Sequence, residues 1–124
     1  MKTPVYTLLN GKFRDKIPIA SEIGIDDPDS MAENALRVLD LGIPVIKIKG
    51  SREYEKDIQR IKAVRKAVGD DVKLRLDPNA AWPTSETIRV MKEVEDCNLE
   101  FLEQPVDGKN LDGMAWVWFW IRYR

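Results

Sequence analysis

The amino-acid sequence predicts an α/β fold with about four parallel β/α units, as in part of a (β/α) TIM-type barrel. Short runs rich in β-branched residues alternate with amphipathic helical patterns, and charged residues recur at the ends of these runs every 26 to 28 residues. A complete barrel has eight such units in roughly 200 residues or more. The chain has 124 residues, so we expect about half a barrel. An open flavodoxin-like sheet has the same alternation and is the alternative fold.

The first unit is expected to begin with a strand at residues 17–25, IPIASEIGI. Asp27 is a suitable N-cap for the following helix, and Pro28 fits its first position. Gly42 is expected to end this helix, because glycine readily adopts the left-handed conformation that follows a last helical turn. The apolar stripe of the helix consists of Met31, Ala35, Leu36 and Leu39.

The second unit starts with residues 43–49, IPVIKIK, which are typical of a strand. Ser51 is the expected cap of the next helix, and Gly69 its expected end. The apolar face of this helix consists of Tyr54, Ile58, Ile61, Val64 and Val68.

The third and fourth units follow the same rhythm. Residues 72–77, VKLRLD, are expected to form a strand, and residues 83–85 open a helix with an apolar face at Ile88, Met91 and Val94. Residues 99–103, LEFLE, are the expected fourth strand. A fourth helix could start near Asn110, although its capping residues are poorer.

The composition narrows the class of protein. The net charge of −1 and the absence of a basic block argue against nucleic acid as a partner. The longest uncharged apolar run, residues 114–121, is too short to span a bilayer. The single cysteine, Cys97, fits a cytoplasmic protein. Because the chain has no histidine, acid–base or metal chemistry falls to Lys, Asp and Glu.

Charged residues stand at the ends of three predicted strands. Lys47 and Lys49 close the second strand, Asp77 closes the third and Glu103 closes the fourth. In a parallel β/α fold the active site lies at the carboxyl ends of the strands, so we expect these side chains at one end and on one face of the sheet. The alternative is ordinary: lysines that alternate with isoleucines on a solvated strand face, and acids that cap helices.

These strand ends carry a resemblance to the muconate-lactonising and mandelate-racemase branch of the enolase superfamily. Residues 4–19 also resemble the end of that family's N-terminal capping domain. The resemblance covers about residues 4–113. It is carried by three ordered segments: Lys47-Ile48-Lys49, Leu76-Asp77-Pro78-Asn79 and Leu102-Glu103-Gln104-Pro105.

The resemblance implies a role for each residue. Lys49 would be the acid–base catalyst that moves a proton alpha to a carboxylate, and Lys47 would lower the pKa of Lys49 by like-charge repulsion. Asp77 and Glu103 would be two of three carboxylate ligands of Mg²⁺, or of Mn²⁺. Asn79 would lie by the substrate or the second lysine. The ion would neutralise an enediolate while a neutral lysine takes the proton.

One further charged residue lies on the same predicted strand face. Arg75 is two residues before Asp77. We expect it to pair with Asp77 or Glu103 rather than to touch a substrate.

The resemblance also implies three regions. Residues 1–16 would be the remnant of the capping domain, residues 17–113 the partial barrel, and residues 114–124 an apolar tail that departs from the family. Its tryptophans alternate, which suits a strand better than a helix, and they are Trp116, Trp118 and Trp120. A shifted reading frame or an artificial end is our leading explanation, and we expect the tail to pack poorly or only against another copy.

The resemblance therefore implies a fragment of a Mg²⁺-dependent cycloisomerase, epimerase or racemase that acts on a small carboxylate. The later barrel strands, the third metal carboxylate and the second acid–base residue are missing, so we expect little or no catalysis. Two alternatives stay open. Two copies could pair through their exposed barrel edges and rebuild a barrel, or the chain could be a non-catalytic module in which the lysines and acids form salt bridges.

Overall fold

The structure is a computed structural model that describes residues 2–122. Its strands form one sheet in the order β1-β2-β3-β4, and every neighbouring pair is parallel. The elements follow in the order α1 (Val5–Leu8), β1 (Ala20–Ile23), α2 (Pro28–Asp40), β2 (Val45–Lys49), α3 (Tyr54–Val68), β3 (Lys73–Asp77), α4 (Thr84–Glu93), the short 3₁₀ helix η1 (Glu95–Cys97), β4 (Leu99–Leu102) and α5 (Leu111–Arg122).

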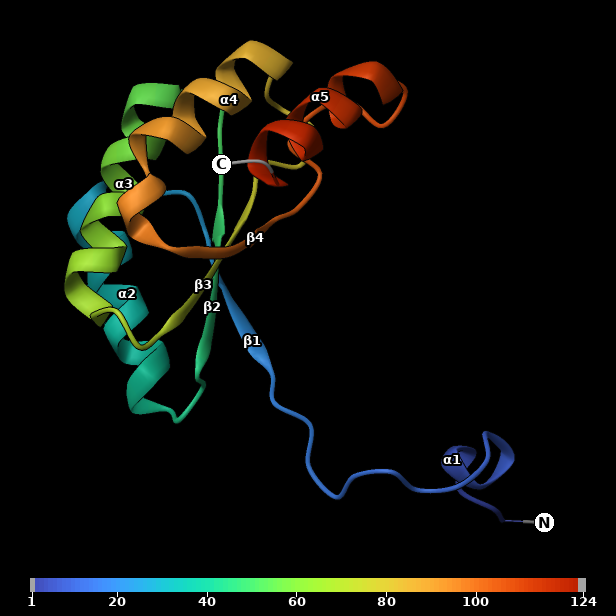
Figure 1. Cartoon of the computed structure of the whole chain (residues 1–124). Coiled ribbons are helices and arrows are strands. Elements are labelled where there is room, and N and C mark those ends of the chain that lie inside the picture. Colours follow the sequence, from blue (N-terminus) through green and yellow to red (C-terminus); the bar gives the residue numbers. More distant parts are fainter. Residues whose placement is uncertain (1, 123–124) are drawn as a thin grey trace.

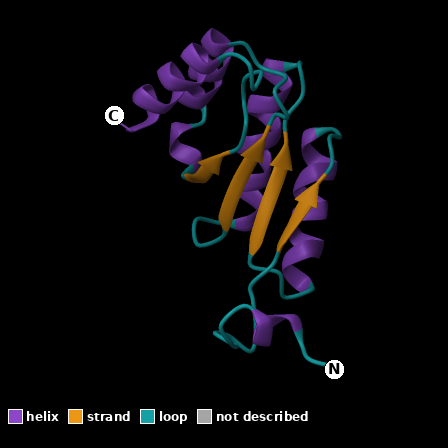
Figure 2. Cartoon of the chain, turned by 90° about the vertical axis from the view of Figure 1, so that its right-hand side faces the viewer, coloured by secondary structure: helices purple, strands orange, loops and turns teal. Residues whose placement is uncertain are grey.

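The layers match part of a barrel rather than a doubly wound sheet. Helices α2, α3 and α4 lie together along one face of the sheet (Figure 1). The opposite face is turned to the viewer in Figure 2, with the strands in front of those helices. The strands are ordered as they occur in the chain, whereas a flavodoxin-like sheet reverses its strand order at a switch point. The predicted α/β fold with parallel β/α units is therefore confirmed.

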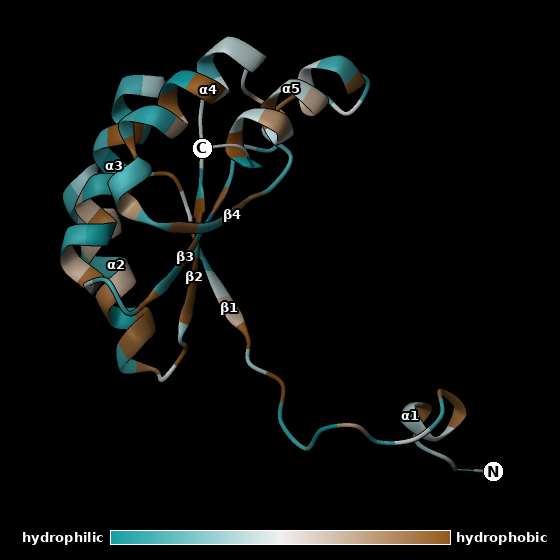
Figure 3. Cartoon of the chain, viewed as in Figure 1, coloured by the Kyte–Doolittle hydropathy of each residue, from teal (hydrophilic) through white to brown (hydrophobic). Residues whose placement is uncertain are grey.

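The core lies between the sheet and the helices. Ile46, Ile48, Leu74 and Leu76 alternate with charged residues along β2 and β3, and all four side chains are buried. Because successive side chains of a strand point to opposite faces, the same alternation sends the lysines of β2 to the uncovered face. Brown, hydrophobic segments occur along the strands in the hydropathy colouring of Figure 3.

The first helix unit forms as expected. Asp27 is the N-cap of α2 and accepts hydrogen bonds from the amides of Asp29 and Ser30, and Pro28 is the first residue of the helix. Gly42 follows the helix with a φ of +77°, a conformation that favours glycine.

The predicted N-cap of α3, Ser51, is wrong. Its N-cap is Glu53, without a side-chain cap.

Ser51 does not cap α3, because a buried acid of that helix binds it. The carboxylate of Asp57 accepts the Ser51 amide at 2.7 Å and its hydroxyl at 2.9 Å. Arg60 pairs with the same carboxylate at 2.8 Å and donates to the carbonyl of Asp26. Both charged side chains are buried. We call Ser51, Asp57 and Arg60 the loop brace, because they tie the loops after β1 and β2 to α3.

Arg65, near the end of α3, is buried and has a different role. Its guanidinium donates hydrogen bonds to four backbone carbonyls, and no carboxylate is among them. The four acceptors are the carbonyls of Gly69, Val72, Cys97 and Asn98. One side chain therefore holds the turn before β3 against the turn before β4.

The C-terminal segment is a helix, so the predicted strand is wrong. The side chain of Asn110 accepts the Gly113 amide at 2.9 Å at the start of α5. The alternating tryptophans led to a wrong prediction because the segment also has apolar residues at three- and four-residue spacing, and these face the rest of the protein. Met114, Val117 and Ile121 line a space of about 270 Å³ between α5, α4 and β4. The last residues of the predicted tail, 123 and 124, lie outside the described residues.

The two faces of α5 are expected to respond differently to substitution. Val117 is 3% exposed and Trp116 is 65% exposed. Val117→Ala should lower the free energy of unfolding by about 2 kcal/mol, because it removes buried methyl groups. Trp116→Ala should change it by less than about 0.5 kcal/mol. Urea denaturation of both variants measures the difference, and equal losses would contradict the packing of α5.

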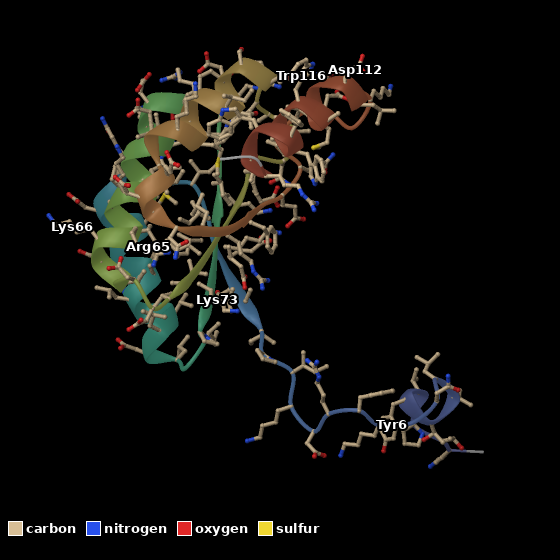
Figure 4. The ribbon with its side chains drawn as sticks, in the orientation of Figure 1. Tyr6, Arg65, Lys66, Lys73, Asp112 and Trp116 are labelled. Atoms are coloured by element: carbon tan, nitrogen blue, oxygen red, sulfur yellow. The ribbon has the colours of Figure 1, made fainter. Side chains whose placement is uncertain are left out.

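The N-terminal arm, residues 2–19, extends away from the sheet and helices (Figure 1). Helix α1 has no buried residue, and Tyr6 stands with the arm in Figure 4. Phe13 is 89% exposed. Within the described residues, no helix combines the length and hydrophobicity needed to cross a bilayer.

Candidate active site

The four charged residues predicted at strand ends come together at one end of the sheet. Lys49 is paired in register with Asp77, and the amide of Glu103 donates to the carbonyl of Leu76 just after β4. Lys47 is one pleat earlier on the same face of β2. The expected geometry, with one end and one face, is confirmed.

Asp77 is the centre of this group. Its Oδ2 lies 2.8 Å from Nζ of Lys49 and 3.1 Å from Nζ of Lys47. Nζ of Lys47 also lies 2.9 Å from Oε2 of Glu103. The Asp77 side chain is 2% exposed, whereas Glu103 is half exposed. A buried carboxylate therefore holds both lysines, and the more exposed carboxylate of Glu103 pairs with one of them.

Glu22 on β1 is a member of this group that the sequence interpretation missed. It is paired in register with Lys47, and its Oε1 lies 3.3 Å from Lys47 Nζ and 3.4 Å from Lys49 Nζ. In the sequence Glu22 looks like any exposed glutamate of a strand, so only the pairing of β1 with β2 identifies it as a member of the site. All four strands therefore contribute to the site.

The carboxylates dominate the electrostatics of the lysines. The hydrogen bond to Asp77 raises the pKa of Lys49, against an opposing effect of burial. Pairing with Glu103 and Asp77 raises the pKa of Lys47. Burial pushes the pKa of Asp77 up, but hydrogen bonds from Lys49, the Asn79 amide and Lys47 outweigh it and leave this pKa below its usual value. The expected depression of the Lys49 pKa by Lys47 is not found, because the hydrogen bonds and charges of Asp77 and Glu22 favour the protonated form of Lys49.

Asn79 joins the site as predicted. Its side-chain Oδ1 accepts a hydrogen bond from Lys49 Nζ at 3.1 Å, and its backbone amide donates to Oδ1 of Asp77 at 3.0 Å. The backbone here is unusual, because Asn79, Ala80 and Gln104 all have positive φ. The amide of Ala80 donates to the carbonyl of Gln104 at 2.7 Å. Left-handed backbone at non-glycine residues costs energy and is concentrated at functional sites.

A close approach of two loops fixes the ends of β2 and β3. The amide of Gly50 donates to the carbonyl of Asp77, and the indole Nε1 of Trp82 donates to the carbonyl of Ser51 at 2.6 Å. A Cβ on Gly50 would lie 3.1 Å from both the Cα of Pro78 and the Trp82 ring. Glycine is needed here for space. The sequence interpretation missed both Gly50 and Trp82, although a tryptophan between two turns was a usable signal.

Arg75 is not paired as predicted. Its Nε donates to Oε2 of Glu100 at 2.6 Å, and its guanidinium lies 4.8 Å from the ring centre of Phe101. The sequence interpretation assigned it to Asp77 or Glu103. Arg75 is one pleat farther from the strand end than Asp77, so the β4 residues beside it are its partners.

The donor set suits a hard divalent cation in part. Asp77 and Glu103 both reach the same ammonium, Nζ of Lys47, so one cation can contact both carboxylates. Carboxylate oxygens are the ligands that Mg²⁺ prefers. Among residues 2–122, however, no three acidic or thiol side chains are grouped closely enough to hold a metal ion together. Asp77 and Glu103 are therefore the two candidate donors among the described residues, and water or other groups would complete the coordination.

Comparison with known proteins gives consistent matches. Residues 30–122 match the family described as enolase C-terminal domain-like. The hydrophobic dipeptide epimerase of Enterococcus faecalis is 40% identical over 114 residues, which are 92% of this chain and 32% of that protein. The chloromuconate cycloisomerase of Cupriavidus pinatubonensis is 35% identical over 114 residues, 90% of this chain and 31% of that protein.

Solved structures agree in fold. The crystal structure of the E. faecalis dipeptide epimerase complexed with Mg and the dipeptide L-Leu-L-Tyr matches with a TM-score of 0.90 at 38% identity. The match covers 94% of this chain and 33% of that chain. The chain thus spans about a third of the length of the relatives that it matches.

The family match extends through α5 to residue 122, beyond residue 113, where the sequence interpretation ended the resemblance. The relatives include epimerases, a racemase and cycloisomerases. The match covers most of the chain, and the structure agrees with it. The chain belongs to the enolase C-terminal domain-like family of the enolase superfamily.

Proposed function

We propose that the chain supplies one side of an isomerase site that moves a proton alpha to the carboxylate of a small substrate. The observation that supports this most is the convergence of Lys47, Lys49, Asp77 and Glu103, from three adjacent strands, at the carboxyl end of the sheet. Relatives that epimerise dipeptides make a dipeptide the first substrate to test.

Lys49 is the proposed acid–base residue. Its Nζ is held by Asp77 and Asn79 at the open face of the sheet, where a substrate can reach it. The neighbouring carboxylates favour its protonated form, which can deliver a proton but cannot accept one. This supports the expectation that the chain by itself catalyses little exchange.

Asp77 and Glu103 are the proposed metal ligands. A bound Mg²⁺ or Mn²⁺ supplies positive charge that stabilises the negative charge developing on the substrate carboxylate. Oδ2 of Asp77 and Oε2 of Glu103 both pair with Lys47, so this lysine has to release at least one of these two oxygens when a cation binds them. Glu22 remains as a partner for Lys47.

Calorimetric titration with Mg²⁺ and Mn²⁺ tests the metal proposal. We expect weak binding, with a dissociation constant on the order of a millimolar, because no three acidic side chains among residues 2–122 are grouped closely enough to hold an ion together. Asp77→Asn should weaken it by about tenfold or more. Glu93→Gln, which changes an exposed acid on α4, is the control and should leave it unchanged. Tight binding would mean that a third ligand comes from elsewhere, and the molecular mass in solution would show whether a second copy supplies it.

Hydrogen exchange into a substrate tests the catalytic proposal. We expect L-Leu-L-Tyr to take up deuterium at the alpha carbon beside its carboxylate only slightly faster with the chain than without it, because the carboxylates around Lys49 favour its protonated form, which cannot accept a proton. Lys49→Ala should abolish this excess, and Lys62→Ala, a change on the outer side of α3, should retain it. Mass spectrometry measures the uptake. Exchange at the rate of a complete enzyme would contradict the expectation of weak catalysis.

A second candidate is a non-catalytic module stabilised by these ion pairs. The observation that favours it is that both lysines pair with Asp77 and with Glu22 inside the chain. In that case Asp77→Asn would lower stability while the affinity for Mn²⁺ stayed the same. The titration above therefore separates the two candidates.

A further inference from the structure

Strand β4 carries one residue more than its neighbour. Leu74 is paired with Leu99, but the next residue, Arg75, is paired with Phe101, so Glu100 is extra. This is a β-bulge, in which two residues of one strand lie opposite one residue of the next.

The bulge changes which side of the sheet each later residue faces. Leu99 and Leu102 both pack against the core, although residues three apart point to opposite faces in a regular strand. The extra residue resolves this conflict. It also determines the position of the next residue. With the bulge Glu103 lies opposite Asp77 on the open face, whereas in a regular strand residue 102 would take that place.

Two contacts on the open face involve the bulged residues. Glu100 pairs with Lys73 at 2.9 Å and with Arg75 at 2.6 Å. Arg75 also stacks on Phe101, with its guanidinium 4.8 Å from the ring centre. Figure 4 labels Lys73 at the beginning of β3. In a regular strand Phe101 would turn towards the helices, so its stacking on Arg75 is specific to the bulged form.

We propose that the bulge in β4 directs the side chain of Glu103 towards the proposed active site, and that Arg75 and Phe101 are positioning residues that stabilise the bulge. Phe101 is 41% exposed on the open face, and the arginine covers it there. Removal of this contact frees β4 to take the regular register, which points Glu103 at the helices. The consequence for metal binding rests on the proposed function, whereas the position of Glu103 does not.

A designed change of register tests the proposal. The triple variant Phe101→Leu/Leu102→Glu/Glu103→Val alternates regularly, with leucine towards the core at 101 and a carboxylate opposite Asp77 at 102. Glu103→Val alone should weaken Mn²⁺ binding by about tenfold. The triple variant should restore wild-type affinity although Glu103 is still replaced. If the wild type binds Mn²⁺, a triple variant that binds no better than Glu103→Val would overturn the proposal.

Arg75→Met tests the positioning role. In the wild-type chain this substitution should weaken Mn²⁺ binding by about tenfold, because the metal-binding side chain of Glu103 is then held in place less well. It should have no effect in the triple variant, whose regular strand needs no such support. A role in stability alone would produce the same loss in both backgrounds. Phe101→Leu alone keeps Leu102 in the core and shows how much the aromatic ring itself contributes.

A second measurement works without metal. A water-soluble carbodiimide joins a carboxylate to a touching lysine, and Lys47 Nζ lies 2.9 Å from Glu103. Peptide mapping should find the link from Lys47 at position 103 in the wild type and at position 102 in the triple variant. If Mn²⁺ fails to bind the wild type while the link moves in this way, the proposed function fails and the bulge proposal stands. A link that is absent at 102 in the triple variant would overturn the bulge proposal.

Discussion

Asp57→Ala is expected to lower the free energy of unfolding by about 3 kcal/mol, because the buried guanidinium of Arg60 loses its buried carboxylate partner and keeps only the exposed one of Glu53, at 3.3 Å. The same carboxylate accepts the amide and hydroxyl of Ser51, two residues after Lys49. The variant therefore loosens the loop that leaves the site as well as the helix behind it. Urea denaturation followed by circular dichroism measures the loss.

The control for this prediction replaces both charges. Asp57→Leu/Arg60→Met removes the pair instead of breaking it, and should cost clearly less than Asp57→Ala, since no charge is then left buried and unpaired. A double variant as unstable as the single one would mean that the hydrogen bonds to Ser51, and not the ion pair, dominate the loop brace.

Arg65→Met is expected to cost about 3 kcal/mol, because it removes the donor for four backbone carbonyls and each unsatisfied buried acceptor costs about 1–3 kcal/mol, reduced where water can enter. The methionine fills much of the same volume, so lost packing is a small part of the effect. The measurement is again equilibrium unfolding in urea.

The neighbouring residue provides the control. Lys66 points to solvent on the next position of α3, and both side chains are labelled in Figure 4. Lys66→Met should change the free energy of unfolding by less than about 0.5 kcal/mol. A similar loss in both variants would show that α3 tolerates no apolar substitution there, and would contradict the assignment of the effect to the carbonyl contacts.

Local rules were sufficient for much of the fold. The N-cap at Asp27, the end of α2 at Gly42 and the alternation along β2 act over a few residues, so the sequence could reveal them. Ser51 and the C-terminal segment were misread for the opposite reason. The partner of Ser51 is a buried acid six residues away, and the apolar stripe of α5 has meaning only beside α4 and β4.

The site was predictable where a strand end carried a recognisable motif. Lys47, Lys49, Asp77 and Glu103 met as expected, because the carboxyl ends of parallel strands share one edge. Glu22 required the pairing of β1 with β2. The partner of Arg75 required the bulge in β4, which changes the register without any glycine or proline in the strand to mark it.

The strand order gives the members of the site unequal local stability. Lys47, Lys49 and Asp77 belong to β2 and β3, which have a hydrogen-bonded neighbour on each side, whereas β1 and β4 are the end strands of this sheet. Amide hydrogens of the central strands should exchange with solvent only on global unfolding, and those of the end strands through local opening. A cation that engages Glu103 will consequently slow amide exchange most along β4, where opening is easiest, and leave that of β2 nearly unaltered.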